Sequence, residues 1–196
     1  GHSHGGYTAV RVALHDARVK ALIPSTPLIN ADAGGKAMFE PLLPLMGIVD
    51  HIPSGVMDSL LDWRLSRDPV MHAFVNYTLW TIGMMDISAK DLINAFVNGA
   101  GFNVEDQLDQ IDCAVLALAG EGEGEELIRQ THTFFDGVSS QIKDLKVFTL
   151  AEDGSDDHCQ LDNRTRANQV VFDWLDDLWD YRAARQVGSD HLIMAI

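Results

Sequence analysis

The sequence opens on a serine framed by glycines, Gly-His-Ser-His-Gly-Gly at residues 1–6. This matches G-x-S-x-G, a pattern in which the glycines permit a sharp strand-to-helix turn that a Cβ would obstruct. The turn lifts the hydroxyl of Ser3 out of the backbone and places the amide of His4 at a helix N-terminus, where it can donate to an oxyanion. The pattern predicts Ser3 as a nucleophile and His4 as a backbone oxyanion donor; the alternative is a glycine-rich turn without a catalytic role.

A serine nucleophile needs a base, most often an imidazole. His158 lies in an Asp-rich loop between the last expected strand and the last expected helix, where the chain order Ser, acid, His places the base. His2 and His4 are too close to Ser3 in sequence to reach back onto it with good geometry. The remaining histidines lack this loop context and are expected at the surface or in packing: His15, His51, His72, His132 and His191.

An acid must hold the imidazole in one tautomer and stabilise its charged form. The acidic, glycine-rich segment 120–125 follows the penultimate expected strand directly, and its spacing favours Glu123. Glu121 and Glu125 remain alternatives. If the segment has no catalytic role, it is a solvated acidic turn.

The two cysteines, Cys113 and Cys159, form no CxxC and no disulfide framework, which favours an intracellular protein without a structural zinc site. Cys159 follows His158 directly. Because neighbouring side chains on an extended loop point apart, we expect His158 not to activate Cys159, and we expect this thiol to be a packing residue. No group of residues has the spacing of a metal site, and no cofactor is expected.

Apolar spacing predicts how these residues are positioned. Strands alternate with helices, which predicts an α/β fold with a mostly parallel sheet and helices on both faces. The expected elements are a small-faced helix over 4–15, strands over 19–23, 113–119 and 146–150, a helix over 127–138, and a final helix capped by Asp162 or Asn163.

The segment 32–110 is rich in Met, Leu and aromatic residues and is broken by prolines, with helical stretches and no convincing strand. We interpret it as a helical cap inserted into a core made of 1–31 and 111–181, with a C-terminal tail over 182–196. Its apolar side chains could face a ligand or could be ordinary packing: Met71, Phe74, Tyr77, Trp80 and Met84.

The formal net charge of −15, without a cluster of Lys or Arg, argues against nucleic acid and anionic membranes as partners and favours a neutral or apolar small molecule. No apolar run has the length of a membrane span, and residues 1–30 do not resemble a cleavable signal. A cytoplasmic protein is therefore expected.

Three groups of residues together resemble a known family: GHSHGGY, RVKALI and STPL near the start, AVLALAGEGEG in the middle, and EDGSDDHCQLDN followed by VFDWLDDL near the end. They are similar to the C-terminal half of α/β-hydrolases, in the branch of dihydroxypseudooxynicotine hydrolase and the fungal polyketide-shortening hydrolases. The resemblance implies a helical cap, a homodimer and no cofactor. It also implies an N-terminal half that supplies the first strands and the second oxyanion amide. The familiar acid in this branch is Asp, whereas here it is Glu.

The resemblance implies hydrolysis of an ester, or of a carbon-carbon bond next to a ketone, in an apolar aromatic or polyketide-like molecule. Ser3, His158 and Glu123 would serve both reactions through an acyl-enzyme. Two alternatives remain: acyl transfer or cyclisation by the same residues, and a catalytically silent binding protein with a hydrolase fold.

Overall fold

The computed structural model describes residues 1–34, 51–67, 69–81, 85–91 and 102–193. The chain divides into two compact units, one made of residues 1–30 and 104–196 and the other of residues 31–103. The first is called the core unit below and the second the cap unit, and each is described by itself.

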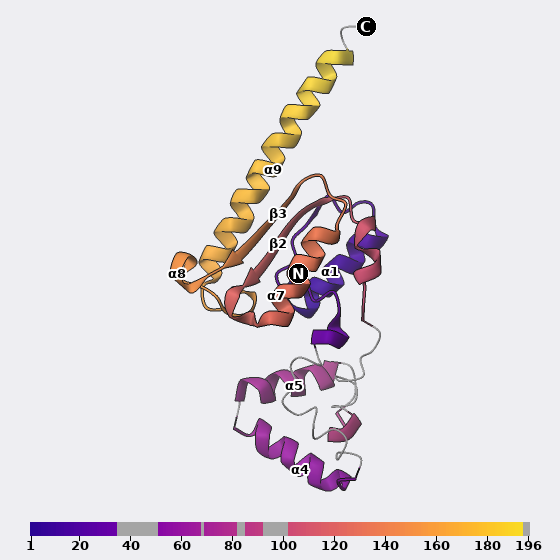
Figure 1. Ribbon diagram of the computed structural model, residues 1–196, viewed down its shortest axis with the longest axis vertical. Coiled ribbons are helices and arrows are strands. Elements are labelled where there is room, and N and C mark those ends of the chain that lie inside the picture. Colours follow the sequence, from indigo (N-terminus) through magenta and orange to yellow (C-terminus); the bar gives the residue numbers. More distant parts are fainter. Residues whose placement is uncertain (35–50, 68, 82–84, 92–101, 194–196) are drawn as a thin grey trace. The chain divides into compact units, whose positions relative to one another are not determined.

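The core unit is built on a parallel sheet in the order β1 (Ala21–Leu22), β2 (Ala114–Gly120) and β3 (Lys143–Phe148). Figure 1 shows β2 and β3 side by side. Every residue of β2 is buried, as expected for a central strand covered on both faces. Parallel bridges from Ser25 to His2 and to Leu118 extend this pairing beyond β1. The chain at residue 2 therefore runs beside β1, directly before Ser3.

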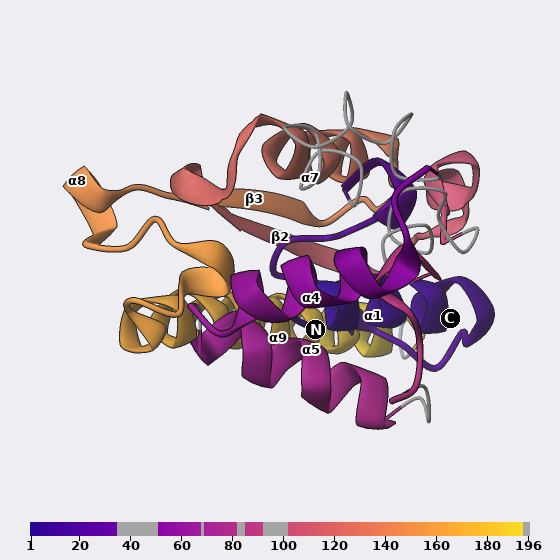
Figure 2. The same ribbon diagram turned by 90° about the horizontal axis from the view of Figure 1, so that it is seen from below.

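Helices cover both faces of the sheet. The side chains of Val115 and Ala117 on β2 belong to one apolar cluster together with residues of α1 (His4–His15) and α7 (Glu125–Gly137). Leu116 and Leu118, which point the other way along the strand, belong to a second cluster together with residues of α9 (Arg164–Ile193). Figure 2 shows α7 and α9 on opposite sides of β2 and β3. The fold class expected from the sequence is confirmed.

The last strand lies earlier than expected. The sequence predicts a strand over 146–150, whereas β3 ends at Phe148 and Leu150 begins the short helix α8 (Leu150–Asp153). The hydroxyl of Thr149 accepts a hydrogen bond from the amide of Glu152 at 3.2 Å and so caps α8. A local capping interaction thus competes successfully with the apolar run.

The two candidates for the cap of the final helix have separate roles. Asn163 Oδ1 accepts from the amide of Arg166 at 3.2 Å, so Asn163 caps α9. Asp162 instead accepts from the hydroxyl of Ser155 at 2.6 Å within the preceding loop. The helix itself continues to Ile193, through most of the segment interpreted as a tail.

Residues 104–110 pack with the core unit, although the sequence places them in the cap. The amide of Val104 donates to the carbonyl of Ile29 at 2.9 Å, and the 3-10 helix η2 (Glu105–Gln110) follows. Val104 and Leu108 are buried in the cluster that α1 and α7 share.

The described part of the cap unit contains the helices α4 (Ser54–Leu65) and α5 (Pro69–Thr81). Met57 and Ala89 form its small buried cluster, and Asp58 accepts from the amide of Ala89 at 2.8 Å. Among the aromatic residues suggested for ligand contact, Tyr77 and Trp80 are 67% and 69% exposed. The side chains of Met71 and Phe74 on α5 are not among those that the structure describes, and Met84 lies outside the described residues.

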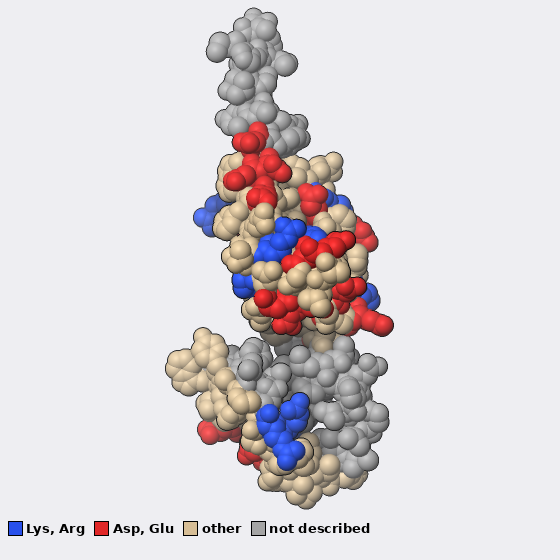
Figure 3. Space-filling model, turned by 90° about the vertical axis from the view of Figure 1, so that its left-hand side faces the viewer, with Lys and Arg blue, Asp and Glu red and all other residues tan. Residues whose placement is uncertain are grey.

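Acidic side chains are spread over the face of the molecule drawn in Figure 3, with basic side chains between them. Among the described residues, no helix combines the length and the apolar composition that a membrane crossing requires.

Candidate active site

Ser3 occupies a strained turn between the paired residue His2 and the first residue of α1. Its backbone has φ 52° and ψ −121°, a conformation that non-glycine residues rarely adopt. The amide of Ser3 donates to the carbonyl of Ser25 at 2.9 Å, and the carbonyl of Ser3 accepts from the amide of Gly6 at 2.7 Å. These bonds fix the turn, and they leave the hydroxyl without a capping bond to α1.

The glycines around Ser3 do not all serve the purpose that the pattern predicts. A Cβ on Gly1 would collide with the carbonyl of Gly5, so Gly1 is required for the turn. A Cβ on Gly5 would meet no atom within 4 Å, so the expected obstruction at this position is wrong. The second constraint comes from Gly6, where a Cβ would lie 3.0 Å from the carbonyl of Thr26. The helix therefore approaches the β1 loop closely through Gly6.

We expect Gly1→Ala to lower the free energy of unfolding by about 1–3 kcal/mol, because the added methyl group displaces the backbone of the turn. Gly5→Ala, its matched control in the same turn, should change this free energy by less than about 1 kcal/mol, since alanine favours the helix and meets no obstacle. Urea unfolding of both variants measures the difference. Equal destabilisation by the two substitutions would contradict the role assigned to Gly1.

Glu123 is the glutamate that contacts His158. It ends the 3-10 helix η3 (Glu121–Glu123), which follows β2 directly, and its Oε2 lies 3.1 Å from His158 Nδ1. The side chain of Glu123 is fully buried, whereas Glu121 and Glu125 are exposed. Burial and the contact with the imidazole therefore separate Glu123 from its two neighbours.

Three further donors surround the Glu123 carboxylate. The hydroxyl of Thr26 lies 2.7 and 2.6 Å from its two oxygens, the amide of Gly120 donates to it at 2.9 Å and the amide of Cys159 at 3.2 Å. Burial by itself would raise the pKa of Glu123, but the hydrogen bonds from His158, Thr26 and Gly120 outweigh it and hold the pKa below its ordinary value. The carboxylate is therefore ionised at neutral pH.

Thr26 is a functional candidate that the sequence analysis did not single out. It has φ 55°, is 1% exposed and bonds to an acid 97 residues away in the chain. The sequence does place Thr26 in a turn shortly after a buried strand, at the same sheet edge as the acid. This position is the signal that could have marked Thr26 as a candidate.

The glycines of the acidic segment admit the loop that carries His158. A Cβ on Gly120 would collide with the carbonyl of Asp156, and one on Gly122 would lie 2.9 Å from the same oxygen. The amide of Gly122 donates to this carbonyl at 2.9 Å. On its other side the loop is held by Asp162, which accepts from the amide of Asp156 at 2.9 Å. The glycines of this segment thus leave room for the loop that carries the base His158, and a glutamate of the same segment supplies the acid.

The expectation that the side chains of His158 and Cys159 point apart on an extended loop is wrong. Cys159 lies in the 3-10 helix η4 (His158–Gln160) with φ 53°, so the loop is not extended there. This left-handed turn folds the thiol back over the ring, and Sγ lies 3.6 Å from His158 Nε2. Arg164 supports the turn by donating to the carbonyl of Cys159 at 2.8 Å. The thiol is buried, as expected for a packing residue, and it also contacts the imidazole.

Ser3 and His158 lie at the same edge of the sheet. The carbonyl of Ser25 accepts from the amide of Ser3 at 2.9 Å and lies 3.7 Å from the sulfur of Cys159, so one oxygen links the serine turn to the histidine turn. Within the described part of the chain, the ring nitrogens of His158 contact Glu123 and Cys159, and the Ser3 hydroxyl is not among their partners.

His2 and His4 take no part in the pair of His158 and Glu123. His2 Nε2 accepts from the guanidinium of Arg164 at 3.0 Å. Burial lowers the pKa of His2, and the positive charge of Arg164 lowers it further. His4 is the first residue of α1, and its ring lies 6.0 Å from that of Tyr7. Its backbone is therefore at a helix N-terminus, where the dipole favours negative charge.

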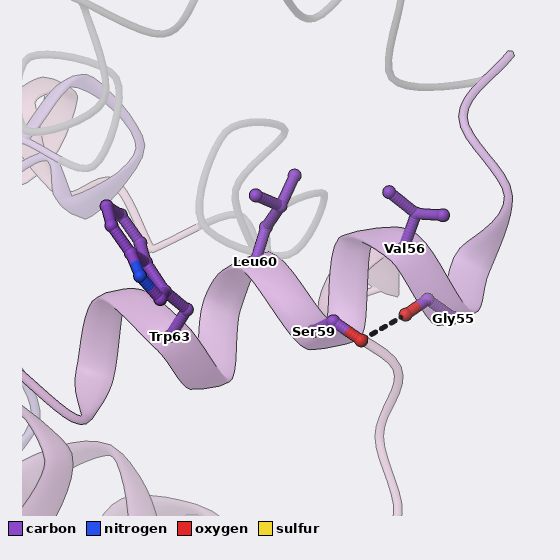
Figure 4. Close-up of a pocket in the computed structure, with 5 residues that line it drawn as sticks. All are labelled: Gly55, Val56, Ser59, Leu60 and Trp63. Atoms are coloured by element: carbon purple, nitrogen blue, oxygen red, sulfur yellow. Dashed lines mark hydrogen bonds between the residues drawn. The ribbon is translucent and has the colours of Figure 1, made fainter.

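Neither a metal cluster nor a reactive lining in the cavity along α4 is found among the described residues. Among the described residues, no group of three or more His, Cys, Asp or Glu side chains is arranged to hold a metal ion. A cavity of about 430 Å³ lies along α4 in the cap unit, and Figure 4 shows its lining. The hydroxyl of Ser59 in this cavity donates to the carbonyl of Gly55 at 2.8 Å, and the other lining side chains are apolar: Val56, Leu60 and Trp63. None of the described residues that line this cavity carries an imidazole, a thiol, a carboxylate or an amine.

In the core unit the serine turn precedes α1, the acid follows β2, and the histidine lies in the loop after β3, all on one parallel sheet. This order of elements is the one that the α/β-hydrolase fold has.

No protein-family model and no curated protein matches the sequence. Among solved structures, the chain is similar to Est816, described as an N-acyl homoserine lactone degrading enzyme, with 17% identity and a TM-score of 0.46 over 87% of this chain and 64% of that one. It is also similar to the enol-lactonase from Burkholderia xenovorans LB400, with 17% identity and a TM-score of 0.38 over 91% of this chain and 64% of that one. The chain thus spans less than two thirds of the length of these proteins, and the likeness carries no conclusion about its activity.

Proposed function

We propose that this protein is a serine hydrolase in which Ser3, His158 and Glu123 act together. The observation that carries the proposal is the contact of 3.1 Å between His158 Nδ1 and the buried Glu123 carboxylate, at the sheet edge where the strained turn presents Ser3. A buried, ionised acid orienting a histidine beside a serine turn is the arrangement that acyl transfer requires.

In the proposed reaction, the ionised Glu123 carboxylate accepts a hydrogen bond from Nδ1–H of His158, and this tautomer leaves the lone pair of Nε2 free to take the proton of the Ser3 hydroxyl. Ser3 then attacks the substrate carbonyl, and the amide of His4 at the start of α1 stabilises the oxyanion. His158 returns the proton to the leaving group. Water, deprotonated by the same imidazole, hydrolyses the acyl-enzyme and regenerates Ser3.

The proposed substrate is an apolar aromatic or polyketide-like molecule, cleaved at an ester or at a carbon-carbon bond next to a ketone. The net charge of −15 supports a substrate without strong negative charge. For carbon-carbon cleavage the leaving group is a carbanion stabilised as an enolate, which protonated His158 neutralises. A homodimer and a cytoplasmic location, both expected from the sequence, belong to the same proposal.

The proposal is tested by treating the full-length protein with a fluorophosphonate probe and mapping the modified residue by mass spectrometry. We expect labelling at Ser3, since the probe reacts with serines activated by a histidine. Ser3→Ala should abolish the labelling, and Ser139→Ala, which replaces an exposed serine bonded to the carbonyl of Asp109, should leave it intact. Labelling that persists in Ser3→Ala would refute the assignment.

A further inference from the structure

We propose that Cys159 is a positioning residue that holds His158 Nε2 in the resting protein and must release it before the imidazole can activate Ser3. This inference rests on the proposed function, because it concerns the same base. The Ser3 turn, the acid and the imidazole are assembled, yet the nitrogen that must accept the serine proton faces a thiol at 3.6 Å.

The thiol of Cys159 is fixed in this place from several sides. Its sulfur lies 3.6 Å from the hydroxyl of Thr26 and 3.7 Å from the carbonyl of Ser25, in addition to the imidazole contact. Its own amide donates to Glu123 at 3.2 Å, and its carbonyl accepts from Arg164. A residue 3% exposed with φ 53° is maintained only where its surroundings determine the conformation.

The thiol of Cys159 and the hydroxyl of Ser3 are both hydrogen-bond donors, and both would donate to His158 Nε2. In the neutral pair the S–H group donates to Nε2, while Nδ1–H donates to Glu123. Transfer of that proton gives a thiolate and an imidazolium without any further reactant. In both forms Nε2 is occupied, and in the charged form it has no lone pair for the proton of Ser3.

The electrostatics of the pair support the charged form. The hydrogen bond with Cys159, followed by that with Glu123, raises the pKa of His158 to about 10, against the opposing effect of burial. Burial would raise the pKa of Cys159, but the hydrogen bond with His158 and then that with Thr26 outweigh it and lower the pKa. The two groups are expected to titrate as one unit.

The other charged groups around this pair belong to several elements. Glu123 on η3 faces both His158 and Cys159, and it is ionised throughout the neutral range. Asp157 accepts from the backbone amide of His158 at 2.7 Å. His2 acts on the pair from the serine turn, and Arg164 on α9 acts on His2. Cys159 is the member whose removal leaves the Glu123–His158 contact in place.

The experiment compares Cys159→Ala and Cys159→Ser with the wild-type protein, using the rate of fluorophosphonate labelling at Ser3 as a function of pH. Without the thiol, the rise of the rate with pH should have its midpoint at least one pH unit lower. Because the fraction of neutral imidazole changes tenfold per pH unit below the midpoint, the rate at neutral pH should rise by about tenfold. Cys113→Ala, the matched substitution at the opposite end of β2, should leave the midpoint unchanged.

A second readout does not require activity. Titration of the His158 ring by NMR, together with the ultraviolet absorbance of a thiolate, should show both signals changing at one midpoint in the wild-type protein, even if Cys159→Ala does not fold. An unchanged midpoint in Cys159→Ser, or an imidazole that titrates independently of the thiol, would overturn the inference. Failure of the proposed function is distinguishable, since it would appear as absence of Ser3 labelling at every pH while the NMR titration still reports on the pair.

Discussion

Ser3→Ala should lower kcat by about 10⁴–10⁶-fold toward any ester that the protein hydrolyses, because the attacking oxygen is removed while the fold is kept. His158→Ala should cost a similar factor, since the hydroxyl then has no base. The double variant should be no slower than either single one, because the two residues act as a unit. Hydrolysis of a chromogenic ester by purified full-length protein, with kcat and KM determined separately, measures all three effects.

The comparison of single and double variants makes this result specific. Substitutions that only disturb the fold would multiply their effects and would lower the midpoint of urea unfolding. Retention of more than about one tenth of the wild-type kcat in Ser3→Ala would contradict the nucleophile assignment.

Glu123→Gln should lower kcat by about 10⁴-fold, because the amide keeps the shape of the side chain but no longer stabilises the imidazolium and can hold His158 in the wrong tautomer. The effect depends on the 3.1 Å contact with Nδ1 and on the complete burial of this side chain. Steady-state kinetics with the same ester measure it.

The chain supplies its own controls for this prediction. Glu121→Gln and Glu125→Gln remove one charge each from exposed positions in the same segment and should change kcat by less than about threefold. A larger loss in either of them than in Glu123→Gln would show that the acid has been assigned to the wrong residue.

The sequence was sufficient for features that depend on local pattern. The apolar run of β2 and the small-residue spacing of α1 predict elements that the structure contains within one or two residues. Both are recognisable because burial on two faces, or on one stripe, imposes a composition that neighbouring residues reveal. The relative order of Ser3, Glu123 and His158 follows from the same patterns, since each lies next to an element that could be predicted.

Boundaries and caps were less predictable. The apolar residues at the end of β3 continue the strand pattern, but the strand ends at Phe148, where Thr149 accepts from the amide of Glu152 and donates its own amide to Asp153. Likewise, Asp162 and Asn163 are equally good caps by residue type. Their separation depends on Ser155, which draws Asp162 into the preceding loop.

What the sequence alone determined is a parallel α/β sheet carrying a serine turn and a histidine loop, because local apolar spacing and glycine placement encode both. The tertiary structure decided which glutamate reaches His158, that Thr26 binds this acid, and that Cys159 faces the imidazole. These contacts join residues from different loops, and two of them involve a non-glycine residue with a left-handed backbone, Thr26 or Cys159. No local pattern specifies such contacts, because their energy exists only once the strands have brought the loops together.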